Sequence, residues 1–341
     1  MTGRERVQAA IHYRPVDKVP LQYFYTPVGF YEHGEKLNDL YERYPGDFAP
    51  FVRQPIPVLP MEIFDAEGRY HSFQRDEWGT LWEYRIFGII GIPAEYPLAD
   101  SALIDSYEPP PVPKLSRTEQ AKAKAAMTAH KEKYYGLHYV GSLFERLRQL
   151  RPDSDVLIDM ALGDPALERL TDKIAEHVSK HIARAIECGA DGIAFGDDYG
   201  TERAMLLSPE LWRKFFKPRL KALFAPAVAA GQDIIFHSCG QITPILEDFK
   251  EIGVSAIWPQ LPAYDMQEIA KQCRSLGLAV AIHTDRAVTM TQGTPQQVQD
   301  LVKREFEVFR MNEGGSWFYI EADNDFPFKN IEALLETIAK F

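Results

Sequence analysis

The sequence predicts an α/β fold, a distorted (β/α)8 barrel of the TIM type, and the order of its apolar segments leads to that prediction. From about residue 117 onward, short apolar runs alternate with amphipathic helical segments, the pattern of parallel βαβ units. No Gly-x-Gly-x-x-Gly follows a predicted strand, which argues against a dinucleotide-binding fold. Barrel enzymes place their chemistry where the loops after the strands converge. Successive apolar runs end here in polar residues, at 196–198, 237–239, 283–285 and 321–323.

The N-terminal third is predicted to combine the first barrel elements with an insertion. A helix over 2–12 precedes the first predicted strand, residues 19–25, which is apolar and aromatic. Residues 65–113 alternate apolar and polar positions around Gly68 and Gly79, which predicts β-hairpins followed by a proline-rich connector. We therefore expect residues 1–341 to form a single barrel domain that carries this β-rich insertion.

The remaining elements are predicted in regular succession. A helix is expected to begin at Pro209, capped by Ser208, and to be kinked or broken by Pro218 and Pro226, because proline removes a backbone donor. The other predicted strands are 134–140, 192–195, 234–236, 256–258, 278–282 and 317–320. The other predicted helices are two short stretches around 28–44 and the segments 117–133, 143–150, 164–187, 244–252, 265–276, 295–311 and 328–339.

Composition limits the partners and the compartment. The net charge of −11 is spread along the chain, so phosphate backbones and anionic membrane surfaces are disfavoured as partners. No run approaches the ~18 apolar residues that span a bilayer, and the N-terminus lacks the apolar core of a signal peptide, so a cytoplasmic location is expected. Cys188, Cys239 and Cys273 are too few and odd in number for a disulfide framework.

Several multi-residue motifs resemble the uroporphyrinogen decarboxylase superfamily. They are DEWGTLW (76–82), GADGIAFGDDYGT (189–201), SPELWRKFFKP (208–218), FHSCGQI (236–242), EIGVSAIWP (251–259), TPQQVQ (294–299) and NIEAL (330–334). The resemblance implies a distorted barrel with its active site in a cleft at the strand C-termini, and a homodimer as the assembly. It also implies one of two activities, which are decarboxylation of uroporphyrinogen without a cofactor and zinc-dependent methyl transfer linked to a corrinoid.

The segment after the first predicted strand favours the methyltransferase branch. Uroporphyrinogen carries many carboxylates, which guanidinium groups would clamp. The resemblance implies that the decarboxylases of the family carry an arginine-rich segment at this position for that purpose. Residues 23–40 of this chain contain no arginine, and their only lysine is Lys36. The segment is aromatic instead, so we expect Tyr25 and Phe30 to line an apolar substrate cleft.

His237 and Cys239 are the candidate metal ligands. At positions i and i+2 of a strand end, both side chains point to the same face, and imidazole and thiolate are both zinc donors. The resemblance implies this His-x-Cys pair together with a second cysteine near the last strand. Residues 309–341 contain no cysteine, so Glu321 is the predicted third ligand, which would give a harder metal with an open fourth position.

Other polar residues at the strand ends are candidates for catalysis and substrate binding. Asp197 and Asp198 could be metal ligands or a base, but one of them could instead cap the next helix or pair with an arginine such as Arg203. His283 could be a satisfied structural histidine. The predicted catalytic residues are Asp197, Asp198 and Tyr199. The predicted substrate-binding residues, besides Tyr25 and Phe30, are Trp258, His283 and Asp323.

Together these residues predict a zinc-dependent methyltransferase. It would move a methyl group between a small O- or S-methyl compound or a thiol and a corrinoid protein that carries methylcobamide, as in O-demethylation. The chain has no cobalamin-binding Asp-x-His-x-x-Gly motif, so the corrinoid is expected on a separate protein. The alternatives are a cofactor-free decarboxylase that uses Asp197 or Asp198 and a non-catalytic barrel that binds a corrinoid or an aromatic ligand.

Overall fold

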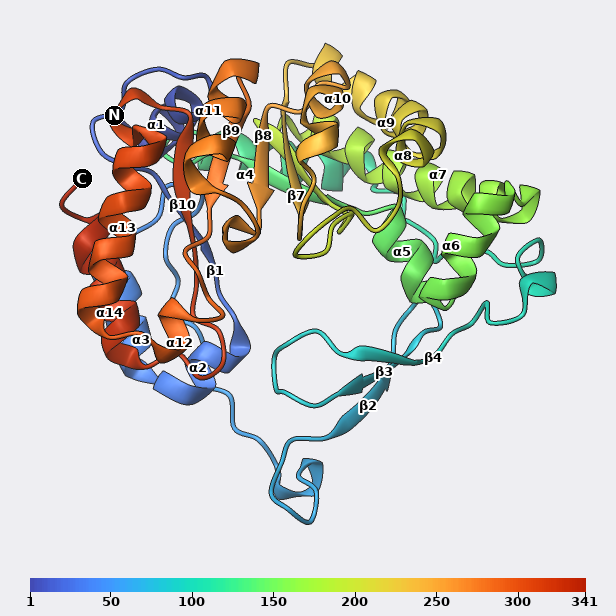
Figure 1. Cartoon of the computed structure of the whole chain (residues 1–341), viewed down its shortest axis with the longest axis horizontal. Coiled ribbons are helices and arrows are strands. Elements are labelled where there is room, and N and C mark those ends of the chain that lie inside the picture. Colours follow the sequence, from blue (N-terminus) through green and yellow to red (C-terminus); the bar gives the residue numbers. More distant parts are fainter. The chain divides into compact units, whose positions relative to one another are not determined.

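The computed structural model describes all residues, 1–341, and confirms the predicted fold class: parallel strands alternate with helices as in a distorted TIM barrel (Figure 1). By internal contacts the chain divides into two compact units. The first comprises Met1–Leu59, Ala126–Leu137 and Val254–Phe341, and the second comprises Pro60–Ala125 and His138–Gly253. None of the helices is both long and apolar enough to cross a bilayer.

Four parallel strands form the sheet of the first unit, in the order β1-β10-β9-β8. Their bounds are β1 (Leu21–Phe24), β8 (Ala256–Pro259), β9 (Ala279–Ile282) and β10 (Ser316–Glu321). Every residue of β9 and β10 is buried, as expected for parallel strands with both faces covered. The pairing of β1 with β10 sets Phe24 opposite Glu321 at the C-terminal end of both strands.

The helices of the first unit begin at residues that satisfy their free amides. Thr2 and Thr294 each form a capping box, with Glu5 and Gln297 respectively. Figure 1 shows α13 and α14 side by side. The helices are α1 (Gly3–Ile11), α2 (Pro27–His33), α3 (Glu35–Arg43), α11 (Met266–Leu276), α12 (Thr289–Gln292), α13 (Pro295–Phe309) and α14 (Phe328–Ile338), and the unit boundary falls within α4 (Arg117–His130).

Three parallel strands form the sheet of the second unit, in the order β7-β6-β5. They are β5 (Leu137–Gly141), β6 (Gly192–Gly196) and β7 (Asp233–Ser238). The long helix α7 is capped by Asp164 and ends at Gly189, whose φ of 77° is left-handed. The helices are α5 (Phe144–Leu150), α6 (Asp153–Leu162), α7 (Pro165–Cys188), α8 (Pro209–Phe215), α9 (Lys217–Ala229) and α10 (Leu246–Glu251).

The predicted β-hairpin insertion is present as a separate antiparallel sheet. Its strands are β2 (Ser72–Arg75), β3 (Leu81–Tyr84) and β4 (Ile92–Glu95). The turn between β2 and β3 is organised by Asp76, whose side chain accepts hydrogen bonds from the amides of Trp78 and Thr80 and from the Trp82 indole, each at 2.9 Å. The DEWGTLW motif therefore has a structural reason for its aspartate and its small residues.

Several elements differ from the sequence prediction. Helices α6 and α12 were not predicted, because α6 follows directly on Arg151-Pro152 and α12 has only four residues. The expected break after Pro209 is confirmed, since α8 and α9 are separated at Phe216. Pro218 lies in the first turn of α9, where its missing N–H costs nothing, and Pro226 is accommodated within that helix.

A buried acid in α13 makes the stability of the chain depend on pH. Glu305 is only 1% exposed, and its Oε2 accepts a hydrogen bond of 2.9 Å from the hydroxyl of Thr284. Burial raises the pKa of Glu305 from 4.5 to about 8, and the charge of Asp285 adds to the rise. The folded protein therefore keeps this carboxyl protonated at neutral pH, whereas the unfolded chain ionises it.

We predict that Glu305→Gln raises the free energy of unfolding at pH 8 by about 1 to 3 kcal/mol and changes it little at pH 5. The acid destabilises the fold increasingly as the pH rises from 4.5 towards 8, and glutamine removes that cost. Denaturant unfolding at both pH values measures the effect, with Glu307→Gln on the exposed side of α13 as control. The same gain at both pH values would contradict the explanation.

Candidate functional site

Three side chains that can bind a metal converge at the C-terminal ends of β6 and β7. Asp198, His237 and Cys239 each offer one ligand atom, and these atoms all lie within 4.8 Å of one another. His237 Nε2 is 3.5 Å from Cys239 Sγ and 3.4 Å from Asp198 Oδ1. All three side chains are partly exposed, so an ion and a further ligand can reach them from solvent. The predicted His-x-Cys pair is thus brought together, with Asp198 as its neighbour.

The spacing of these donors suits zinc. With Zn–N of ~2.05 Å, Zn–S of ~2.3 Å and Zn–O of ~2.1 Å, the edges of a tetrahedron are ~3.6 Å for nitrogen to sulfur and ~3.4 Å for nitrogen to oxygen. The observed separations of 3.5 and 3.4 Å match both edges. A three-ligand site with one open position is the arrangement of catalytic zinc centres. The two separations made by His237 therefore fit a zinc site, and the third pair of ligand atoms lies within 4.8 Å.

Backbone pairing between the two strand ends sets this geometry. The register of β6 and β7 places Gly196 opposite His237, and the amide of Asp197 donates to the carbonyl of His237 at 3.0 Å. The amide of Cys239 donates to Asp198 Oδ1 at 2.8 Å, which fixes that carboxylate beside the histidine. Each donor is therefore held by main-chain hydrogen bonds as well as by its own rotamer.

Two glycines allow the loops that follow β6 and β7 to touch. A Cβ on Gly200 would lie 2.4 Å from the amide nitrogen of Gln241, and one on Gly240 would lie 2.2 Å from the carbonyl carbon of Gly200. Gly240 also has a φ of +68°, which side chains rarely adopt. The glycines of the GDDYGT and FHSCGQI motifs are therefore required by close backbone approach, and together they bring Asp198 to Cys239.

The side chain of Asp197 is buried and supports the loop after β6 from inside the protein. It is fully buried, and its Oδ1 accepts hydrogen bonds from the amides of Leu143 and Glu145 at 3.0 and 2.9 Å, so it caps the first turn of α5. The hydroxyl of Tyr199 donates to its Oδ2 at 2.9 Å. Burial raises the pKa of Asp197 to about 7 despite these donors. Arg203, a predicted partner, is exposed and pairs with neither aspartate.

Tyr199 belongs to an aromatic core. It is fully buried, its ring stacks on Phe144 at 5.5 Å between centroids, and it meets Trp212 and Phe216 at 5.8 and 5.3 Å. Its amide also donates to Ser238 Oγ at 3.0 Å, between the two metal-ligand candidates of β7. A catalytic role for Asp197 or Tyr199 stays a prediction. In the structure, both residues hold the loop that carries Asp198.

The ion pair of Glu145 and Arg148 beside this loop was not predicted. Burial raises the pKa of Glu145 to about 7, and the negative charge of Asp198 adds to the rise. Arg148 donates to Glu145 Oε1 and to Asp153 Oδ2, each at 2.7 Å. The only sign of this ion pair in the sequence was an acidic residue followed three positions later by a basic residue at the start of α5. That pattern is also common on solvent-exposed helices.

In the first unit, the polar residues after β9 and β10 form their own cluster. Arg286 Nη1 lies 3.1 Å from Glu321 Oε1 and 3.3 Å from Asp323 Oδ2, and His283 Nε2 lies 3.7 Å from Glu321. Burial and the charge of Asp323 raise the pKa of Glu321, although Arg286 opposes the rise. Since Glu321 belongs to a different unit from His237, its predicted role as a metal ligand stays a prediction.

Arg286 was missed because an arginine between strand and helix has many ordinary uses. Its position directly after the polar run 283–285 was the only signal in the sequence. It neutralises two adjacent carboxylates that would otherwise repel each other at the end of β10. This arrangement makes the predicted substrate residue Asp323 part of a salt bridge.

The predicted aromatic substrate residues also lie in the first unit. Tyr25 is half-buried against Phe30, Tyr41 and Phe51, with ring centroids 5.6 to 6.3 Å apart, and Phe30 is 2% exposed. Trp258 is partly exposed and packs on Tyr319 at 3.9 Å. Tyr25 and Trp258 are therefore accessible to a ligand, whereas Phe30 supports Tyr25 from the core.

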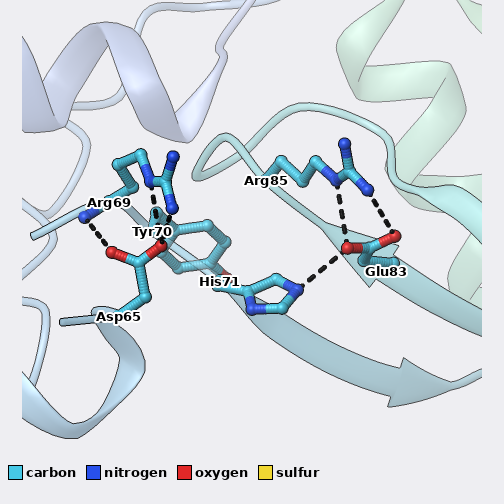
Figure 2. Close-up of a pocket in the computed structure, with 6 residues that line it drawn as sticks. All are labelled: Asp65, Arg69, Tyr70, His71, Glu83 and Arg85. Atoms are coloured by element: carbon cyan, nitrogen blue, oxygen red, sulfur yellow. Dashed lines mark hydrogen bonds and ion pairs between the residues drawn. The ribbon is translucent and has the colours of Figure 1, made fainter. Parts of the chain in front are cut away.

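A hollow of about 300 Å³ on the insertion lies outside the predicted site (Figure 2). Asp65 pairs with Arg69, and Glu83 accepts from both His71 and Arg85. Figure 2 shows that the charged side chains lining the hollow are engaged with one another. We assign these ion pairs a structural role, which is to stabilise the hairpin.

The chain was compared with known proteins. The family model "Uroporphyrinogen decarboxylase (URO-D)" matches residues 151–340. The uroporphyrinogen decarboxylase of Thermus thermophilus is 33% identical over 92 residues, 27% of this chain and 26% of that protein. That of Chlorobaculum tepidum is 27% identical over 135 residues, 38% and 35% respectively. The matches thus span well under two thirds of these relatives.

The comparison with solved structures covers the whole chain. A methyltransferase from Methanosarcina mazei aligns with 100% of this chain and 99% of its own, with a TM-score of 0.66 and 16% sequence identity. At this identity the alignment shows a shared fold. The fold predicted from the alternation of strands and helices is therefore found along nearly the whole of a solved protein.

We predict that Tyr199→Phe lowers the free energy of unfolding by about 1 to 3 kcal/mol, because it leaves the buried Oδ2 of Asp197 with only the amide of Leu143, at 3.2 Å, while keeping the ring packing. Denaturant unfolding measures the loss. Tyr139→Phe is the matched control, since Tyr139 is 65% exposed. Equal stability of the two variants would show that the hydroxyl of Tyr199 does not support the loop.

Proposed function

Because the chain belongs to the uroporphyrinogen decarboxylase family, we propose that it is a zinc-dependent methyltransferase of that family. It would move a methyl group between a small O- or S-methyl compound or a thiol and a corrinoid protein. The observation that carries the proposal is the cluster of Asp198, His237 and Cys239, in which the two separations made by His237 match edges of a zinc tetrahedron. The fold shared with a methyltransferase along the whole chain supports it.

The three donors would hold the metal, each in a defined role. His237 supplies a neutral imidazole, Cys239 a thiolate and Asp198 a carboxylate, whose Oδ1 is already oriented by the amide of Cys239. When bound, zinc supplies Lewis acidity that lowers the pKa of a thiol or stabilises the leaving heteroatom of a methyl donor. A carboxylate in place of a second thiolate would make the ion harder and more acidic.

In the second unit, the residues beside the donors would keep the metal site rigid. Asp197 and Tyr199 hold the loop of Asp198 through buried hydrogen bonds. In the first unit, Tyr25 and Trp258 offer aromatic surface, and Arg286 neutralises Glu321 and Asp323. Residues 23–40 contain no arginine, so a small uncharged methyl compound suits the chain better than a polycarboxylate.

The second candidate is a decarboxylase that needs no cofactor. The two curated relatives, both uroporphyrinogen decarboxylases, favour it, although the matches cover only part of each. In that case an aspartate of the loop after β6 would stabilise a protonated intermediate, and no metal would be needed. The two candidates therefore differ in how their activity responds to a chelator.

We predict that the purified chain binds one zinc ion at this centre and that His237→Ala or Cys239→Ser reduces the bound zinc there to background. Asp198→Asn keeps the shape of the side chain but removes the charge, so we expect zinc affinity to fall about 10- to 100-fold. Elemental analysis and zinc titration measure both effects. A wild-type chain that folds normally and binds no zinc at residues 237 and 239 would refute the centre.

Glu321→Gln provides the matched comparison for the third ligand. If Asp198 is that ligand, Glu321→Gln leaves zinc affinity within about twofold while Asp198→Asn weakens it. If instead Glu321→Gln causes the larger loss, Glu321 is the third ligand as the sequence predicted. Circular dichroism on each variant separates loss of metal from loss of fold.

We predict that a strong chelator abolishes methyl transfer to a free thiol from a methylcobamide-loaded corrinoid protein and that added zinc restores it. The reason is that the acceptor thiol is activated only while the metal lowers its pKa. Methyl transfer is followed by the change in the corrinoid absorption spectrum. Release of carbon dioxide from uroporphyrinogen that persists in chelator would favour the decarboxylase instead.

A further inference from the structure

Two histidines on α7 face each other in the second unit, in a part of the chain that the proposed methyl transfer does not use. His177 and His181 are four residues apart, so they lie on the same face of the helix. Their Nε2 atoms are 3.2 Å apart, and both side chains are partly exposed. The sequence that places them is His-Val-Ser-Lys-His, at 177–181.

The surroundings of His177 direct its Nε2 towards His181. Its Nδ1 lies 3.1 Å from the carbonyl oxygen of Pro110, which can only accept, so Nδ1 carries the proton. Nε2 of the neutral ring is then left with its lone pair. The ring is also fixed by an edge contact with Trp78, at 4.7 Å between centroids. A hydrogen bond from Nδ1 to a carbonyl is the usual support of a metal-binding histidine.

The distance between the two nitrogens suits a shared metal ion. With metal–nitrogen bonds of ~2.0 to 2.1 Å, two nitrogens 3.2 Å apart subtend an angle of ~100 to 105° at the ion, close to a tetrahedral angle. In the absence of metal, the same pair is compatible with a hydrogen bond from one neutral ring to the other. Without metal, the two imidazole rings therefore satisfy each other at this position.

A cavity of about 170 Å³ beside the pair is also lined by a carboxylate that could turn towards an ion. Glu77, from the turn between β2 and β3, lines this cavity with both histidines, and its charge acts on both of them. Burial lowers the pKa of both imidazoles, which keeps them neutral and ready to coordinate near pH 7. Glu77 is exposed, so its side chain can turn towards an ion without losing a buried contact.

Two of the three positive charges nearby lie beside carboxylates. Arg146 lies 3.7 Å from Asp76, and Lys180 pairs with Glu176 at 2.9 Å. Arg184 is held by the carbonyl oxygen of Pro113 at 2.6 Å. The carboxylate partners of Arg146 and Lys180 therefore reduce the repulsion of a cation. Two neutral nitrogens with one carboxylate would make a donor set that favours zinc over magnesium or calcium.

We propose that His177 and His181, with Glu77, bind a divalent transition-metal ion of the zinc class, at a second site separate from Asp198, His237 and Cys239. The three residues come from α7 and from the insertion. The ion would therefore tie the β2–β3 turn to the long helix.

The connector after the insertion already runs along the same face of α7. Arg169 pairs with Asp105 at 2.8 Å, Lys173 Nζ donates to the carbonyl of Tyr107 at 2.6 Å, and His177 meets Pro110. These contacts are spaced by four residues along the helix. An ion at the next turn, at His181, would extend this series and add to the stability of the insertion.

The test is a zinc titration of the full chain in which His237→Ala and Cys239→Ser have removed the first centre. We expect one zinc ion still to bind and to raise the melting temperature. Adding His181→Ala should weaken that binding by about 100-fold or more, because loss of a ligand costs at least as much as loss of a supporting hydrogen bond. Glu77→Gln should weaken it about tenfold, and Lys180→Ala on the same turn is the control.

His181→Ala leaves the bond of His177 to Pro110 in place, so the fold of α7 is retained. If the background variant does not fold, the wild-type chain and His181→Ala are compared directly, and the proposal expects one fewer zinc ion in the variant. The proposal is overturned if His181→Ala and Lys180→Ala bind zinc equally well, or if the background variant folds and binds none. Loss of the first centre alone leaves it intact.

Discussion

The buried carboxylate of Asp197 is the interaction on which the candidate metal centre depends. It accepts hydrogen bonds from the amides at the start of α5 and from Tyr199, while its own amide donates to the carbonyl of His237. One residue therefore links the C-terminal ends of β5, β6 and β7. Without these donors, a fully buried carboxylate would cost several kcal/mol, so the loops must keep this arrangement for the chain to fold.

This constraint explains why adjacent aspartates have different roles. Asp197 points into the protein and fixes the loop, and Asp198 points outward, where its oxygen lies beside His237 and accepts the amide of Cys239. The close approach of Gly200 and Gly240 then brings the loop after β6 against the loop after β7. Catalytic metal sites need ligands within about 0.5 Å of the productive geometry, and main-chain contacts of this kind provide it.

Much of this could be predicted from the sequence because strand periodicity and motif position carry it. The parallel strands, the hairpin insertion and the pairing of His237 with Cys239 follow from patterns within a few residues. The sequence offered helix capping as a role for one of the two aspartates. Which of them turns inward, and that Arg286 pairs with two carboxylates, could not be predicted, because both depend on residues far away in the chain. Helix α6 was missed for a local reason, since its short pattern follows directly on Arg151-Pro152.

The difference between local and long-range information also concerns the third metal ligand, for which the family resemblance implies a second cysteine that this chain lacks near its last strand. The sequence directs attention to the last strand, where Glu321 stands, but the structure engages Glu321 with Arg286 and raises its pKa, and both features make a carboxylate a weaker ligand. Asp198 is partly exposed and already lies at tetrahedral distance from His237. In the proposed site, this donor from the neighbouring strand end would stand in for the second thiolate that the family resemblance implies. The identity of the third ligand would then be a property of the GDDYGT motif and not of the last strand.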